Sequence, residues 1–172
     1  MVIGMSRATK EMLARIITHT LFLIMLYICQ AMVFSELRIL GCSPLIIPLG
    51  VVGVALFEGA AWGGGFGLAA GVLCDISFSE TIFMFTILMT AIGMGVGLLS
   101  EFVLARGFPS YFLCCIAVLL AVAFFQMFPL FVFDKVNWRP ISETALIQTL
   151  YSMIFIIPVY YFSHRVSRKL RI

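Results

Sequence analysis

The sequence predicts an all-α fold: a polytopic membrane protein of about six transmembrane helices, with both termini on the cytoplasmic side. Hydrophobic residues make up 63% of the chain and charged residues 11%, against roughly 45–50% and about 25% in soluble domains. The apolar residues fall in runs of about 20, the length that crosses a bilayer as a helix. Because six such spans use about 120 positions, the 172 residues leave no room for a soluble domain, and we expect one domain, 1–172.

Each expected span is an apolar run bounded by charged residues, glycine or proline. The first run follows a basic stretch, but it is too long for a signal-peptide core and lacks a clear cleavage site, which favours an uncleaved span. Pro44 and Pro48 interrupt the second run, either within a membrane helix or in an interfacial stretch before it. The expected spans are Leu13–Phe34, Leu37–Phe57, Gly59–Ile76, Ile82–Leu99, Tyr111–Phe133 and Ala145–Phe162.

Basic residues set the expected orientation. Seven of the 11 Lys and Arg residues lie in the two tails, and placing both tails inside puts 8 basic residues inside and 3 outside. This distribution follows the positive-inside rule. An alternative is that the chain around Glu58 and Gly59 is one span plus a re-entrant segment. That version would place the basic tails on opposite sides, so it is disfavoured.

A stripe of small residues is the sharpest pattern in the chain. Glycines recur every four residues in the third span, and the stripe drifts by about 40° per step along a helix. Small residues at this spacing let helix backbones approach closely in membranes. Two interpretations stay open, packing against another helix of this chain or against a partner's helix. The helix-packing or partner-binding candidates are Gly59, Gly63, Gly67, Gly71 and Asp75, with Gly93 and Gly97 in the fourth span.

Three acidic residues lie at expected span ends. Asp75 closes the glycine stripe, either as a headgroup-level helix end or as a polar anchor for an outer loop or a partner. Glu58 precedes the third span and is expected to accept hydrogen bonds from the backbone N–H groups that start it. Glu101 and Arg106 bracket the inner turn after the fourth span and are expected to form an ordinary solvated pair.

The residues that carry catalysis or bind metals are sparse. Only His19 and His164 are histidines, and no mid-span carboxylates, HExxH motif or CxxC pair occurs. His19 is expected to form an interfacial or interhelical hydrogen bond. The run from Gly65 to Ala70 matches G-x-G-x-x-A but lacks the preceding strand that a dinucleotide site needs. We therefore expect no enzymatic activity, no cofactor, no metal and no nucleic-acid partner.

Three regions of the sequence are similar to a known family. They are the stretch Gly63–Asp75, which reads Gly-Gly-Gly-Phe-Gly-Leu-Ala-Ala-Gly-Val-Leu-Cys-Asp, the glycine-rich Gly93–Gly97, and a last span with Tyr151, Ile157-Pro158 and Tyr160-Tyr161 before a basic tail. In these regions the chain resembles MreD, a small multi-spanning rod-shape-determining protein of bacteria. It departs from that pattern at Cys74 and Glu80, where a leucine and a more glycine-rich turn are expected.

The resemblance implies a non-enzymatic scaffold of the wall-elongation (rod-shape) machinery in the bacterial inner membrane. The partners that it implies are an MreC-like protein, wall-synthesis enzymes of the elongation complex, the MreB cytoskeleton indirectly, and the lipid bilayer. An alternative is a substrate-binding S-component of an energy-coupling-factor vitamin importer, which also has six helices. That function needs a polar pocket open to the outside, for which the candidates are Gln30, Asp75, Ser77, Ser79, Glu80 and Asn137.

Overall fold

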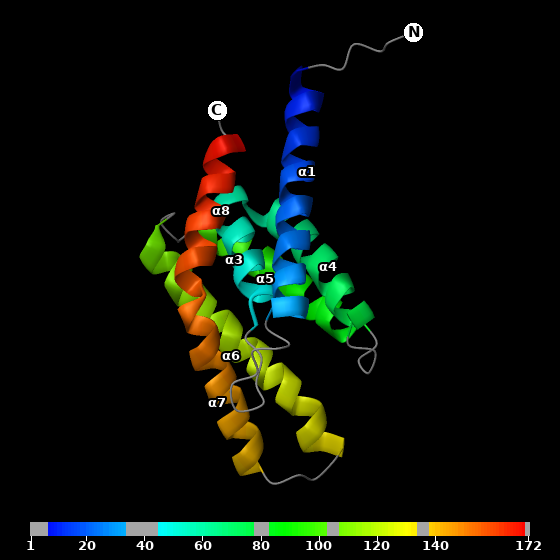
Figure 1. The fold of residues 1–172 in the computed structure, drawn as a ribbon, viewed down its shortest axis with the longest axis vertical. Coiled ribbons are helices and arrows are strands. Elements are labelled where there is room, and N and C mark those ends of the chain that lie inside the picture. The colour runs from blue at the N-terminus through cyan, green and yellow to red at the C-terminus, as the bar shows by residue number, and fades with distance from the viewer. Residues whose placement is uncertain (1–6, 34–44, 78–82, 103–106, 134–137, 171–172) are drawn as a thin grey trace.

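The computed structural model describes residues 7–33, 45–77, 83–102, 107–133 and 138–170. Every regular element in these ranges is helical, which confirms the all-α class (Figure 1). The elements are α1 (Arg7–Ile28), the π-helical segment η1 (Cys29–Val33), α3 (Ile47–Glu58), α4 (Ala60–Ser77), α5 (Met84–Phe102), α6 (Phe108–Phe133), α7 (Trp138–Ile154) and α8 (Ile156–Leu170).

Fewer helices than expected have the length to cross a bilayer. By length and composition, three segments of the described chain qualify, Met12–Met32, Met84–Phe102 and Phe108–Gln126. A fourth is obtained when the bent pair of α7 and α8 counts as one span. The other two expected spans correspond to the shorter apolar helices Ile47–Glu58 and Ala60–Ile76. The described part of the chain thus has three to four apolar helices long enough to cross a bilayer, together with shorter apolar ones, which is compatible with an all-α membrane protein.

The expected second span is a short, central helix. The sequence predicted Leu37–Phe57, whereas α3 begins at Ile47, with Pro48 in its first turn, where the missing N–H costs no helical hydrogen bond. Residues 37–44 lie outside the described part of the chain. Twelve helical residues extend about 18 Å, well short of the roughly 30 Å hydrocarbon core.

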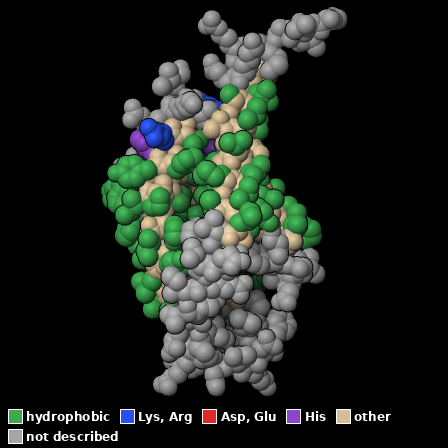
Figure 2. All heavy atoms as spheres, viewed as in Figure 1, with side chains coloured by type: hydrophobic (Ala, Val, Ile, Leu, Met, Phe, Trp, Pro, Cys, Tyr) green, Lys and Arg blue, Asp and Glu red, His purple; other side chains and the backbone are tan. Residues whose placement is uncertain are grey.

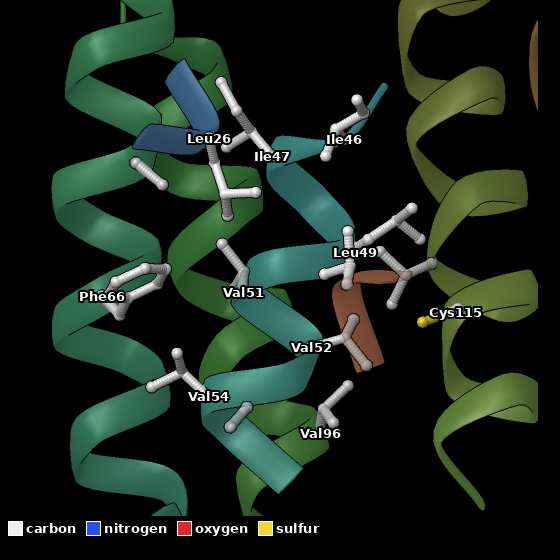
Figure 3. Packing of buried hydrophobic residues seen from close by; sticks show 14 of the residues in the cluster. Leu26, Ile46, Ile47, Leu49, Val51, Val52, Val54, Phe66, Val96 and Cys115 are labelled. Atoms are coloured by element: carbon white, nitrogen blue, oxygen red, sulfur yellow. The ribbon is translucent and has the colours of Figure 1, made fainter. Parts of the chain in front are cut away.

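The other helices enclose α3 almost completely. Its side chains Leu49, Val51, Val52 and Leu56 are all 0% exposed. Helices α1, α4, α5, α6 and α8 all contact it. Figure 3 shows Phe66 of α4 on one side of α3 and Cys115 of α6 on the other. Because the surrounding helices bury α3 on every face, it forms the centre of the hydrophobic core and not a lipid-facing span.

A single glycine separates α3 from α4. Gly59 has a φ of +93°, in the region that only glycine adopts freely. Its N–H still donates to the Ala55 carbonyl at 3.0 Å, and its own carbonyl accepts from Gly63 N–H at 2.9 Å. Helical hydrogen bonds therefore continue up to the break on both sides, while the chain changes direction at this residue.

The expected sixth span, Ala145–Phe162, is a broken helix. Helices α7 and α8 meet at Phe155 at an angle of 49°. Pro158 explains the position of the break, because its ring clashes with the carbonyl four residues earlier, that of Ile154, and it has no N–H to donate. The Phe155 N–H instead bonds the Ser152 carbonyl at 3.1 Å. In Figure 1 the start of α1 and the end of α8 lie at the same end of the molecule.

Candidate functional site

The glycine stripe packs against a helix of the same chain. A Cβ added to Gly63 would lie 2.5 Å from the Gly93 carbonyl oxygen. One added to Gly67 would overlap the Met89 carbonyl, and one added to Gly71 the backbone of Thr86. These glycines are buried, and α4 and α5 run in backbone contact along their length. This arrangement matches the internal interpretation of the stripe.

The far end of the same seam is just as tight. A Cβ on Gly97 of α5 would overlap Ala60 at the start of α4. A Cβ on Gly59 would lie 2.6 Å from the Glu101 carboxylate. The seven candidate residues of the sequence therefore lie together along the interface between α4 and α5, and Ala55 of α3 packs against the same line at Gly63.

Carboxylates bind both ends of this helix pair. The Asp75 carboxylate at the end of α4 accepts from the Phe85 N–H at 3.2 Å, the Thr86 N–H at 2.9 Å and the Thr86 hydroxyl at 2.6 Å. The Glu101 carboxylate at the end of α5 accepts from the Ala60 N–H at 3.1 Å. Each acid satisfies N–H groups that have no partner within the first turn of the other helix.

Polar groups from distant helices satisfy the first turn of α3. The Gln30 side-chain oxygen, in η1, accepts from the N–H groups of Ile46 and Ile47 at 3.0 Å each. The Leu45 N–H donates to the Ser152 hydroxyl of α7 at 2.9 Å. Because unpaired N–H groups are costly in a medium without water, these three hydrogen bonds allow α3 to begin inside the protein.

The opposite end of α3 carries a buried acid. The Glu58 side chain is 3% exposed and lies 3.7 Å from the Arg15 guanidinium of α1. The Ser167 hydroxyl of α8 donates to it at 2.5 Å. Glu58 therefore joins α1, α3 and α8, and the expectation that it binds the start of the third span is wrong. Glu101 occupies that role, because its side chain lies over the turn that Glu58 precedes.

Beside this ion pair, His19 is 4% exposed. Its Nδ1 lies 2.8 Å from the Arg15 carbonyl oxygen, and its ring stacks on Trp62 of α4 at 5.6 Å. The hydrogen bond is within α1, and the contact with α4 is made by the ring face. His19 thus packs α1 against α4. The sequence predicted an interfacial or interhelical hydrogen bond, whereas the contact between the helices is made by the stacked rings.

Sequence reasoning missed two further contacts of α3. The buried Tyr111 hydroxyl of α6 donates to the Leu49 carbonyl at 2.9 Å, and the Ser100 hydroxyl of α5 contacts the Ala55 carbonyl at 3.3 Å. In the sequence, Tyr111 is the first residue of the expected fifth span and Ser100 directly follows the expected fourth span, and neither has a feature that indicates a partner. Only the central position of α3 gives them carbonyl partners in another helix.

Other candidates fall outside these contacts. Among the described residues, no group of three or more His, Cys, Asp and Glu residues is placed to hold a metal ion. Ser79, Glu80, Asn137 and Arg106, together with the side chain of Ser77, lie outside the described residues. Within the described chain, Gln30 and Asp75 are the remaining candidates for a solute site, and they lie at the first turns of α3 and α5 respectively.

The outward side of α4 also carries small residues. Ala61, Gly65 and Ala69 are spaced by four and exposed, and a Cβ added to Gly65 would meet no atom within 4 Å. We call these three residues the outer strip. It is the face of α4 that looks away from α5.

In comparisons with known proteins, no family model, no curated protein and no solved structure matches the chain.

Proposed function

We propose that this chain is a non-enzymatic membrane scaffold whose helices hold a partner protein in the bilayer. On the strength of the sequence resemblance, we further propose the bacterial inner membrane and the wall-elongation machinery, with an MreC-like protein as the direct partner. The observation that carries the scaffold proposal is the use of the polar side chains. Gln30, Asp75, Glu58 and Glu101 all bind helix ends or other helices of this chain.

The same observation disfavours the solute-binding alternative. A vitamin site needs polar groups that are free to bind a solute. The Gln30 carbonyl oxygen already accepts two backbone N–H groups, and both Asp75 oxygens accept from the start of α5. A solute that displaced the backbone N–H groups from the Gln30 oxygen or the Asp75 carboxylate would break a helix cap, at a cost of about 1 kcal/mol or more.

The outer strip is the place where the scaffold proposal is most sharply tested. A helix that packs on α4 at small residues is displaced by a bulky side chain. Gly65→Leu adds that bulk at an exposed position whose Cβ would meet no atom within 4 Å. The matched control is Ala117→Leu, at an exposed position of α6.

The experiment is a detergent pull-down of the tagged chain from its native membrane, followed by mass spectrometry. We expect MreC-like and wall-synthesis proteins to accompany the wild type and A117L but not G65L, at equal accumulation of all three. Recovery of two ATPases and a membrane coupling subunit would instead identify a solute-capture protein. Equal capture by G65L and A117L would exclude the outer strip as the partner face.

A further inference from the structure

A hollow of about 710 Å³ lies along the outer side of α8. It is lined by Pro158, Tyr161, Phe162, His164 and Arg165. Four of these positions follow the spacing i, i+3, i+4 and i+7, so they share one helix face. The lining is graded along the helix, with Pro158, Tyr161 and Phe162 toward the middle of the molecule and His164 and Arg165 toward the end of α8. Figure 2 shows basic and histidine side chains gathered at this end, beside hydrophobic ones.

Aromatic contacts hold the lining side chains in place. The Phe162 ring stacks on Phe22 of α1, with centroids 5.2 Å apart. The His164 ring stacks on Tyr160 at 5.8 Å and meets Phe57 of α3 edge-on at 5.4 Å. On the opposite side of α8, the Ser167 hydroxyl is bound to buried Glu58. The hollow is therefore formed by a helix that is anchored to the core on its other face.

The positive charge in the hollow has no carboxylate partner among the described residues. Arg165 is exposed. The three acids with described side chains are engaged elsewhere, since Glu58 pairs with Arg15, Asp75 binds the start of α5, and Glu101 binds the start of α4. Arg168, Lys169 and Arg171 follow in the sequence and add to the positive potential of this tail. An anion from outside the chain is the partner that complements this charge.

The apolar part of the lining restricts what that anion can be. Pro158 and Arg165 are seven residues apart, which corresponds to about 10 Å along a helix. Over this distance the lining changes from apolar side chains to a guanidinium. Such a lining suits an amphiphile whose hydrocarbon lies beside the apolar side chains and whose negative group lies at Arg165. A small, fully hydrated anion would gain nothing from Tyr161 and Phe162.

We propose that this hollow binds an anionic phospholipid of the leaflet that faces the two termini. The Arg165 guanidinium contacts the lipid phosphate, and His164 flanks it. Pro158, Tyr161 and Phe162 contact the glycerol region and the first part of an acyl chain. The proposal is independent of the scaffold function, because it concerns the exposed face of α8 and not the outer strip of α4.

Native mass spectrometry of the full chain in detergent tests this proposal, with added palmitoyl-oleoyl phosphatidylglycerol as the probe. Phosphatidylcholine with the same chains is the lipid control. The variant R165Q removes the charge in the hollow, and R171Q removes one charge from the same tail as a matched control. Tyr161→Ala removes an exposed part of the apolar wall, and thermal unfolding of each variant verifies its fold.

We expect phosphatidylglycerol to remain bound to the wild type and phosphatidylcholine to bind more weakly. R165Q should weaken phosphatidylglycerol binding by about tenfold, as expected for the loss of one charge-assisted contact, while R171Q has a clearly smaller effect. Tyr161→Ala should weaken binding of both lipids. Equal losses for R165Q and R171Q would overturn the proposal in favour of general surface attraction. Equal binding of the two lipids, or displacement of the lipid by millimolar inorganic phosphate, would also overturn it.

Discussion

Asp75 of α4 and Glu101 of α5 stand at opposite ends of the α4–α5 pair, and each accepts backbone hydrogen bonding from the start of the helix that carries the other. Asp75 of α4 binds the N–H groups of Phe85 and Thr86 in α5, and Glu101 of α5 binds the N–H of Ala60 in α4. The negative charge lies at the positive end of a helix dipole in both cases. Between the two acids, the glycine seam brings the backbones into contact. The pair is thus fixed in register by polar contacts at its ends and by close packing along its length.

Loss of the Asp75 cap should destabilise the pair. In Asp75→Ala, two N–H groups and the Thr86 hydroxyl lose their acceptor, and we expect the free energy of unfolding in detergent to fall by about 1–2 kcal/mol. Asp75→Asn keeps one carbonyl oxygen and should lose less. The measurement is a denaturant titration followed by circular dichroism. Equal stability of Asp75→Ala and the wild type would show that the cap contributes nothing.

The two faces of α4 should respond in opposite ways to one added methyl group. Gly67→Ala places a Cβ against the Met89 carbonyl and should cost about 1–3 kcal/mol through overpacking. Gly65→Ala meets no atom within 4 Å and should be neutral or stabilising by up to about 1 kcal/mol, because alanine favours the helix. Thermal unfolding in one detergent compares the two. A destabilised Gly65→Ala with an unaffected Gly67→Ala would reverse the assignment of the inward face.

Substitutions at Glu58, the buried acid of α3, and at its neighbour Arg15 should have non-additive effects on the free energy of unfolding. Arg15→Gln leaves the Glu58 carboxylate, which is 3% exposed, without its cationic neighbour, and should cost roughly 1–3 kcal/mol. Adding Glu58→Gln removes the uncompensated charge, so the double variant should be more stable than Arg15→Gln alone. The measurement is a double-mutant cycle, which compares the free energies of unfolding of the wild type, the two single variants and the double variant. Simple additivity would mean that Arg15 and Glu58 do not interact.

The bend between α7 and α8 should depend on Pro158. Pro158→Ala restores an N–H that donates to the Ile154 carbonyl and removes the ring clash, so the 49° bend should decrease. Spin labels at Leu150 and Tyr161, both exposed, would move farther apart in a double electron–electron resonance measurement. Ile157→Ala, at the adjacent exposed position, is the control and should leave the distance unchanged. An unchanged distance in Pro158→Ala would show that tertiary contacts and not the proline impose the bend.

Most helices were predictable from the sequence because their signal is local. Each i→i+4 hydrogen bond joins neighbouring residues, and apolar runs bounded by glycine, proline or charge define where such bonds can form without water. The expected spans Gly59–Ile76, Ile82–Leu99 and Tyr111–Phe133 correspond closely to α4, α5 and α6. Pro48, which interrupts the expected second span, lies in the first turn of α3. The sequence predicted one span over Ala145–Phe162 and did not predict the break that precedes Pro158.

By itself, the sequence determined that this chain is helical and apolar enough for a membrane, and that some backbones must meet at the glycines Gly63, Gly67 and Gly93. Only the tertiary structure decided which backbones meet, because a missing Cβ permits a close approach without specifying the approaching helix. It also decided that Glu58 binds Arg15 and Ser167 while Glu101 binds the start of α4, and that α3 is a short, enclosed helix. The physical reason is that burial and hydrogen-bond partners depend on neighbours distant in the chain, whereas hydropathy depends on the residue alone.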